Sequence, residues 1–232
     1  LTGEQRKLYL ANQDRIAQQV QHREASEFKK DKLKVLAELT KLRQICCDPH
    51  LHYEDYKAGS AKLDACMELV HGALDGGHHI LLFSQFTGML DIIGKRLAKE
   101  DIAFLKLTGA SSKESRAKMV ARFQAGEVPV FLISLKAGGV GLNLTAADVV
   151  IHYDPWWNVA AQDQATDRAH RIGQQHTVTV YKLIAKDTIE ERIMQMQESK
   201  RDLVNSVLGG DGISSALFTR EDVLALLGGD GR

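Results

Sequence analysis

The stretch Ile80-Leu81-Leu82-Phe83-Ser84-Gln85-Phe86-Thr87 decides the fold that we predict for this chain. Its first four residues are apolar without interruption, which is typical of a short strand buried on both faces. The polar residues from Ser84 onward predict a loop at the carboxyl end of that strand. A helical pattern over residues 88–99 comes next. A buried strand, a polar loop and a helix form the repeating unit of a parallel α/β sheet.

Four further strands are predicted downstream of this unit, at residues 104–107, 130–133, 149–153 and 178–184. Helical patterns alternate with these strands, which favours a parallel sheet with helices on both faces. The sequence before and after this region reads as helix alone. We therefore divide the chain into a helical segment (1–58), an α/β domain (59–185) and a C-terminal helical part (186–232).

Composition narrows the possible partners. With 232 residues, 44% of them hydrophobic, the chain can bury a core of ordinary size. Its 30 basic residues balance its 30 acidic residues, so any binding of a polyanion must use a local patch. No apolar run is long enough to span a membrane, and the N-terminus lacks a signal-peptide pattern.

The cysteines indicate the cellular compartment of the chain, and its first residue indicates whether it is a fragment. Three cysteines are too few and too clustered for a disulfide framework, which favours a reducing, intracellular compartment. The spacing of Cys46, Cys47, His50 and His52 fits no paired-ligand pattern, so we predict no metal site. Because the chain begins at Leu1 without a Met, we expect it to be a fragment of a longer protein.

The loops after the predicted strands are the first candidates for chemistry, because ligands bind at the carboxyl ends of parallel strands. Ser84 and Gln85 follow the first strand and offer polar groups to a phosphate. Residues 108–112 form a small-residue loop with Gly109 that leads directly into a helix, whose N-terminal N–H groups suit a phosphate. An ordinary loop whose serine caps the helix is the alternative.

A glycine-rich loop follows the third strand. Three of the four residues from Gly138 to Gly141 are glycine, so the backbone can approach a ligand closely, and Lys136 adds a positive charge beside them. One alternative is dinucleotide binding, because Gly139-x-Gly141 follows a strand. The third glycine of that fingerprint is missing, since residue 144 is Leu. A purely structural glycine turn is the other alternative.

Two arginines near residue 170 form a candidate anion clamp. Gln164, Arg168 and Arg171 are spaced at i, i+4 and i+7, so they share one face of a helix predicted to begin near Val159. The planar donor forks of two such arginines suit phosphate oxygens. The alternative is an exposed helix in which Asp167 and Arg171 form an i,i+4 ion pair.

The sequence lacks the two other features of an ATP site, a phosphate-binding loop and an acidic pair for Mg²⁺. No segment matches the Gly-x4-Gly-Lys-[Ser/Thr] pattern of a phosphate-binding loop. No paired acidic motif follows a strand to hold Mg²⁺. The chain can therefore offer an anion clamp but not the cradle of the nucleotide, and it looks like half of a phosphoryl-transfer site.

Five stretches together resemble the second RecA-like domain of the Swi/Snf-type ATP-dependent DNA translocases, in helicase superfamily two. These stretches are Ile80 to Phe86, Leu107-Thr108-Gly109 with Arg116 and Phe123, Ser134 to Leu144, Asp154-Pro155-Trp156-Trp157-Asn158, and Gln164 to Gln174. The resemblance extends over most of the chain. It departs from the family pattern at Asp48, where histidine is common, and at Val159, where proline is frequent.

The resemblance implies a RecA-like α/β fold with a C-terminal brace helix, and it implies roles for individual residues. Arg168 and Arg171 would be arginine fingers that reach an ATP held with Mg²⁺ by a first RecA-like lobe of the same polypeptide. Gln164 would contact the nucleotide, and Gly139 with Gly141 would couple the nucleotide cleft to the DNA path. The residues that would line this path for backbone phosphates are Ser84, Gln85, Gly109, Ser134, Lys136 and Gly138.

The function expected from this resemblance is that of the second motor lobe of an ATP-dependent double-stranded DNA translocase or remodeller. The chain alone is expected to be inactive as an ATPase. We expect a monomer with no membrane contact, in the bacterial cytoplasm or nucleoid, or in the nucleus if the source is eukaryotic. Two alternatives stay open: a catalytically silent interaction module, and a cofactor-binding α/β domain that uses the glycine loop.

Overall fold

A computed structural model describes residues 1, 3–22, 25–135, 137, 142–156, 159–169, 177–199 and 219–228. The chain divides into two compact units. One comprises Leu1–Lys62 together with Ile184–Arg232, and the other comprises Leu63–Leu183. The helical ends of the sequence thus belong to a single unit. The three-part division predicted from sequence, at 1–58, 59–185 and 186–232, stays a prediction.

In the described residues, five parallel strands form the sheet of the second unit. These are β1 (Ile80–Ser84), β2 (Phe104–Leu107), β3 (Val130–Ser134), β4 (Val149–His152) and β5 (Thr179–Lys182). Their order is β2-β3-β1-β4-β5, and the pairings are parallel. β1 and β3 are buried at every residue, as their unbroken apolar runs predict. The predicted parallel α/β fold is confirmed.

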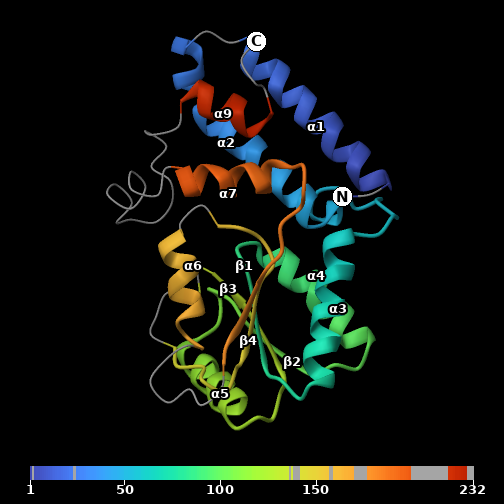
Figure 1. Cartoon of the computed structure of the whole chain (residues 1–232), viewed down its shortest axis with the longest axis vertical. Helices are drawn as coiled ribbons and strands as arrows, with labels where there is room; N and C mark the ends of the chain where they lie inside the picture. Colours follow the sequence, from blue (N-terminus) through green and yellow to red (C-terminus); the bar gives the residue numbers. More distant parts are fainter. Residues whose placement is uncertain are drawn as a thin grey trace. The chain divides into compact units, whose positions relative to one another are not determined.

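Helices cover both faces of this sheet (Figure 1). They are α3 (Ala61–Asp75) and α4 (Thr87–Lys99) on one face, and α5 (Lys113–Gln124) and α6 (Val159–Thr166) on the other. Alternation along the strands explains the two layers, because successive side chains point to opposite faces. Leu81 and Phe83 belong to one apolar cluster with Phe123 of α5, whereas Leu132 lies beside Gly94 of α4.

The first unit is built from helices that lie far apart in the sequence. They are α1 (Gly3–Gln21), α2 (Ala25–Cys47), the 3-10 helix η1 (Pro49–Leu51), α7 (Ile189–Ser199) and α9 (Arg220–Leu226). The predicted C-terminal helical part begins with α7, which is described as far as Ser199, and residues 200–218 lie outside the described part. Among the described residues, no helix has both the length and the apolar character needed to cross a membrane.

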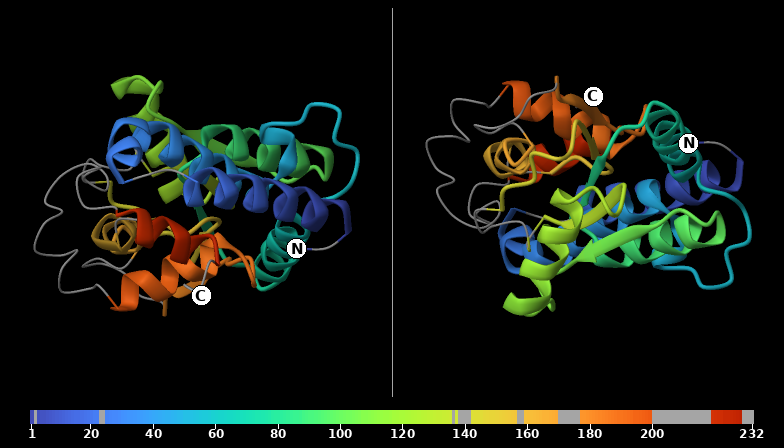
Figure 2. Two further views of the ribbon diagram at one scale, coloured as in Figure 1. Left: turned by 90° about the horizontal axis from the view of Figure 1, so that it is seen from above. Right: turned by 90° about the horizontal axis from the view of Figure 1, so that it is seen from below.

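Polar contacts join the two ends of the sequence inside this unit. The backbone N–H of Ile189 donates to the hydroxyl of Tyr9 at 2.7 Å. Arg220 donates from Nε to the carbonyl of Val20 at 3.1 Å and from a terminal nitrogen to that of Gln21 at 2.9 Å. These carbonyls belong to the last turn of α1, where the helix itself supplies no donors. Figure 2 shows α9 lying beside α7, so the C-terminal helix is an integral part of the unit.

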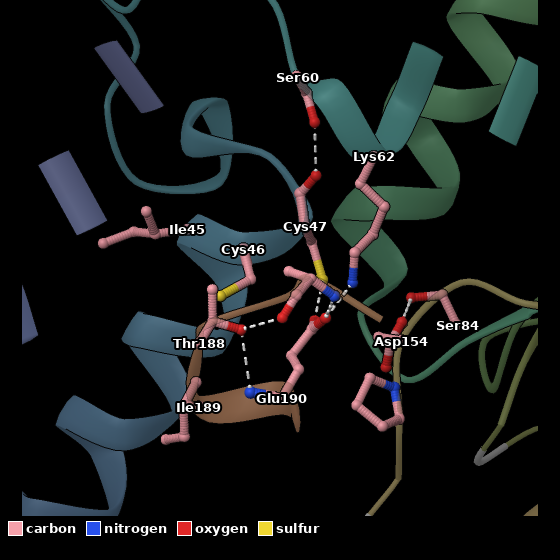
Figure 3. A network of polar contacts seen from close by, with 12 residues as sticks. Ile45, Cys46, Cys47, Ser60, Lys62, Ser84, Asp154, Thr188, Ile189 and Glu190 are labelled. Atoms are coloured by element: carbon pink, nitrogen blue, oxygen red, sulfur yellow. Dashed lines mark hydrogen bonds and ion pairs between the residues drawn. The ribbon is translucent and has the colours of Figure 1, made fainter. Parts of the chain in front are cut away.

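A buried ion pair lies in the interior of the first unit (Figure 3). Lys62 and Glu190 form a salt bridge with side chains that are 4% and 0% exposed. The same Glu190 carboxylate accepts a hydrogen bond from the backbone N–H of Ala185 at 2.9 Å. Nearby, the Ser60 hydroxyl donates to the carbonyl of Cys47 at 2.8 Å. The ion pair therefore connects the first turn of α3 to the first turn of α7.

The surroundings of Lys62 favour its charged form. Burial, the largest single influence, lowers the pKa of Lys62, but the charge and hydrogen bond of Glu190 together with Cys47 and Cys46 outweigh it, so the pKa of Lys62 is raised. Two buried charges cost much desolvation free energy, which their attraction and hydrogen bonds must offset. Removing only one partner would leave the other charge buried and unpaired.

We predict that Lys62→Met lowers the free energy of unfolding by about 3–5 kcal/mol, because the buried Glu190 carboxylate then lacks its cationic partner. Adding Glu190→Gln should recover part of this loss, since the amide is neutral and its oxygen still accepts from Ala185. Equilibrium denaturation in urea measures both effects. The matched control is Lys118→Met in the exposed Lys118–Glu114 pair, which should change stability by no more than about 0.5 kcal/mol. Equal effects of the two lysine substitutions would contradict the prediction.

Candidate functional site

The carboxyl ends of three neighbouring strands bring predicted site residues to one edge of the sheet. Ser84 closes β1 and is paired in register with Ser134, which closes β3. β2 pairs with β3 up to Leu107 and leads into the loop that carries Gly109. Parallel strands end on the same side of a sheet, so loops that lie far apart in the sequence converge here.

A pocket of about 390 Å³ lies at this edge, in the second unit. It contains three of the residues predicted to line a DNA path, namely Gln85, Gly109 and Ser134. Its lining consists of these three with Thr87, Asp91, Lys106, Thr108 and Ala110. A Cβ atom on Gly109 would meet no heavy atom within 4 Å. The position is open, so a ligand can approach the backbone there.

Thr87 belongs to the polar loop that the sequence places after the first strand, but sequence reasoning missed Lys106 as a member of this pocket. Lys106 interrupts the apolar run of β2 and forms an exposed salt bridge with Asp91 of α4. A lysine inside a short apolar strand was the available signal, but its position relative to the loops depends on the sheet order. Thr87 is the first residue of α4, where a free helix N-terminus favours anions.

A buried carboxylate is hydrogen-bonded to Gln85 of the pocket lining. Asp154 follows β4, is 1% exposed, and accepts a hydrogen bond from the hydroxyl of Ser84. Its other oxygen accepts from the backbone N–H of Gln85 at 3.3 Å and from the Gln85 side-chain amide at 2.6 Å. Asp154 was not among the predicted site residues. Its place next to Ser84 follows from the β1–β4 pairing, which no local pattern reveals.

The start of the glycine loop is held by side chains. The hydroxyl of Ser134 accepts from the backbone N–H of Ala137 at 3.2 Å, and Arg116 of α5 donates to the carbonyl of Ala137 at 3.1 Å. Arg116 belongs to the family pattern recognised in the sequence. The other predicted loop residues, Lys136, Gly138, Gly139 and Gly141, lie outside the described residues.

The helix predicted to carry the anion clamp is shorter than expected. α6 ends at Thr166, and residues 167–169 form a turn. The prediction that Gln164 and Arg168 share one helical face is therefore wrong. The hydrogen bonds tighten after Thr166, with the N–H of Arg168 and of Ala169 each bonding three residues back. The carbonyl of Arg168 instead accepts from the N–H of Leu144 at 3.0 Å.

The clamp residues differ in exposure. Gln164 is exposed on α6, whereas Arg168 is 2% exposed. Arg171 lies outside the described residues. The nucleotide roles of Gln164, Arg168 and Arg171 therefore stay predictions.

A second buried titratable group, His152 of β4, lies beside Phe83 in the β1–β4 pairing. His152 is 1% exposed, stacks on the Phe83 ring at a centroid distance of 5.5 Å, and contacts the hydroxyl of Thr166 through Nε2 at 2.9 Å. Its Nδ1 is buried without a hydrogen-bond partner among the described residues. Burial, with a contribution from the charge of Lys182, lowers the pKa of His152 to about 4.

Comparison with known proteins identifies the family. The family model described as "Helicase conserved C-terminal domain" matches residues 61–173. The solved SWI2/SNF2 ATPase C-terminal domain of Sulfolobus solfataricus has a TM-score of 0.78 and 32% identity, covering 97% of this chain and 93% of that one. This chain belongs to the C-terminal domains of the SWI2/SNF2 ATPases.

This SWI2/SNF2 domain also matches one part of several longer proteins. The Sulfolobus solfataricus SWI2/SNF2 ATPase core in complex with dsDNA has a TM-score of 0.80 and 35% identity, covering 97% of this chain and 48% of that one. An uncharacterized ATP-dependent helicase of Mycoplasma pneumoniae is 41% identical over 222 residues, which are 95% of this chain and 21% of the relative. The chain spans about a fifth of the length of the bacterial relatives that it matches.

We predict that His152 makes this SWI2/SNF2 domain less stable in mild acid. An unfolded histidine takes up a proton near pH ~6.5, whereas folded His152 stays neutral until about pH 4. Its contribution is therefore fully present above pH ~6.5 and is lost as the pH falls toward about 4. Between pH ~7 and ~4.5 the loss should be about 2–3 kcal/mol.

Urea denaturation of the wild type and of His152→Gln at both pH values measures this contribution as the difference between their pH dependences. The matched control is His22→Gln, because His22 is exposed at the end of α1. The control should keep the pH dependence of the wild type. A His152→Gln protein that loses as much stability in acid as the wild type would show the prediction to be wrong.

Proposed function

We propose that this chain is the second motor lobe of an ATP-dependent translocase acting on double-stranded DNA. Membership in the SWI2/SNF2 C-terminal domains carries this proposal, since the match extends over 97% of the chain. A structure with a similar fold is an SWI2/SNF2 core solved in complex with dsDNA. The Mycoplasma relative is named an ATP-dependent helicase.

The DNA backbone would be received at the carboxyl edge of the sheet. The pocket there offers hydroxyls from Thr87, Thr108 and Ser134, the ammonium of Lys106, and open backbone at Gly109. Gln85 lines this pocket and Ser84 precedes it in the same loop, and the glycine loop with Lys136 and Gly138 would extend the same path. Such groups contact phosphates without reading base sequence. Because the chain has no net charge, this local patch would supply the attraction, and salt should weaken it.

The nucleotide would be shared with a first RecA-like lobe. Gln164, Arg168 and Arg171 are donors suited to phosphate oxygens, and Gly139 with Gly141 would link their site to the DNA path. Among the described residues, no three His, Cys, Asp or Glu side chains are grouped so that they could hold a metal ion. The donor set therefore fits stabilisation of charge on a phosphoryl group, while Mg²⁺ would be held by the other lobe. ATP bound there supplies the phosphoryl group whose charge these donors would neutralise.

The isolated chain should not hydrolyse ATP, because its sequence lacks a phosphate-binding loop and the acid pair for Mg²⁺. In a polypeptide that joins it to a first RecA-like lobe, we expect DNA-stimulated hydrolysis. Arg171→Ala should lower this rate by about 10³-fold or more while DNA binding is retained. A coupled assay for ADP release measures the rates. Steady hydrolysis by the purified chain alone, or full activity of Arg171→Ala, would contradict the proposal.

Gly109→Ala should weaken binding of duplex DNA by about three- to tenfold with little change in stability. The added methyl meets no protein atom within 4 Å, but it would stand where a phosphate approaches the backbone. Fluorescence anisotropy with labelled duplex DNA at low salt measures the affinity. The matched control is Gly72→Ala on the exposed side of α3, which should leave binding unchanged and stabilise the helix by about 0.5–1 kcal/mol. If Gly109→Ala binds duplex DNA as tightly as the wild type, Gly109 does not contact the DNA backbone.

A further inference from the structure

The hydrogen atoms of two predicted phosphate ligands are already committed within the protein. The hydroxyl of Ser84 donates to one oxygen of Asp154, and its oxygen accepts from the backbone N–H of Phe86 at 3.1 Å. The side-chain amide of Gln85 donates to the other oxygen of Asp154 at 2.6 Å and to the carbonyl of Pro155 at 3.3 Å. A hydroxyl has one hydrogen and an amide nitrogen has two. Neither side chain keeps a hydrogen for a phosphate oxygen in this arrangement.

The carboxylate of Asp154 dictates the orientation of these groups. It is 1% exposed, and among the described residues no Lys, Arg or His forms a salt bridge with it. A buried carboxylate needs donors to offset its desolvation. Ser84 and Gln85 provide three of them, and hydrogen bonds to a charged acceptor are strong. Because a carboxylate only accepts, the nitrogen rather than the oxygen of the Gln85 amide must face it (Figure 3 shows the Ser84–Asp154 contact).

The same contacts extend to the beginning of α4. Phe86 is the residue before this helix, and its N–H is held by the Ser84 hydroxyl, which Asp154 holds in turn. Thr87, the first residue of α4, lines the pocket. Asp154 thus connects the end of β4, the end of β1 and the N-terminus of α4 through one carboxylate.

We propose that Asp154 is a positioning residue for DNA binding, which acts by holding the Ser84–Gln85 loop and the start of α4 in the shape that receives the backbone. Ser84 and Gln85 then act through this shape, while Thr87, Gly109 and Ser134 supply the contacts to phosphate. This inference rests on the proposed function, because it takes the pocket to be part of the DNA path.

Substitution of Asp154 and of Asp91 by asparagine separates positioning from simple charge. Both substitutions remove one negative charge near the same pocket, but Asp91 is exposed and pairs only with Lys106 among the described residues. Neutralising Asp91 should tighten binding of duplex DNA by about two- to threefold, since it removes a like charge and releases Lys106. Asp154→Asn should weaken binding by about tenfold, because one amide oxygen cannot replace two carboxylate oxygens.

The measurement is fluorescence anisotropy of the whole chain with a labelled duplex of mixed sequence, together with thermal unfolding of each variant. Tighter or equal binding by Asp154→Asn in a folded protein would overturn the inference. If the wild-type chain does not bind duplex DNA, the proposed function fails and the inference fails with it. Wild-type binding with an unchanged Asp154→Asn affinity overturns the inference alone.

A double-mutant cycle provides a second test that does not need a folded Asp154 variant. Ser84→Ala and Gln85→Ala should each weaken DNA binding, and the double substitution should cost less than the product of the two effects. Side chains that act through one shared carboxylate behave as a unit, whereas independent phosphate ligands have additive free energies. Fully multiplicative losses of affinity would show that Ser84 and Gln85 bind DNA directly and would overturn the inference.

Discussion

The candidate site depends on the parallel pairing of β1 with a strand on each side. This pairing sets Ser84 beside Ser134 and Phe83 beside His152. It also brings Asp154 to Ser84 and Gln85, although 70 residues of sequence separate Asp154 from Ser84. Because β1 is paired on both sides and buried along its whole length, a shift of its register would break both pairings and disturb the packing on both faces of the sheet. The position of every loop at the carboxyl edge follows from this constraint.

Two kinds of buried charge are stabilised differently in the two units. Lys62 and Glu190 neutralise each other as an ion pair, so the charge of each is cancelled by its partner. Asp154 is satisfied by hydroxyl and amide donors instead, and its negative charge is not cancelled by a described cation. Because the Asp154 carboxylate accepts from the Ser84 hydroxyl and the Gln85 amide, both donor groups must point toward it. In this domain the first arrangement joins segments of the chain, whereas the second shapes a surface that is proposed to bind DNA.

The strands and the fold were predictable from the sequence because their signals are local. Unbroken apolar runs such as 80–83 and 130–133 mark strands buried on both faces. The end of α6 was not predictable, since the contact between Leu144 and the carbonyl of Arg168 joins residues from different loops. The role of Asp154 was missed for the same reason. The pocket could be located in outline from loop composition, but Lys106 required the order β2-β3-β1.

The contacts that Tyr9 makes with Ile189, and Arg220 with the last turn of α1, have a consequence for folding during synthesis. These partners lie 180 and about 200 residues apart in the chain. A ribosome releases α1 and α2 long before it has made α7 and α9, so the first helices must wait without their partners. The sheet of residues 63–183 can form in the meantime. Of these two units, the one that contains α1 is therefore completed after the sheet, and contacts of such high sequence separation form slowly.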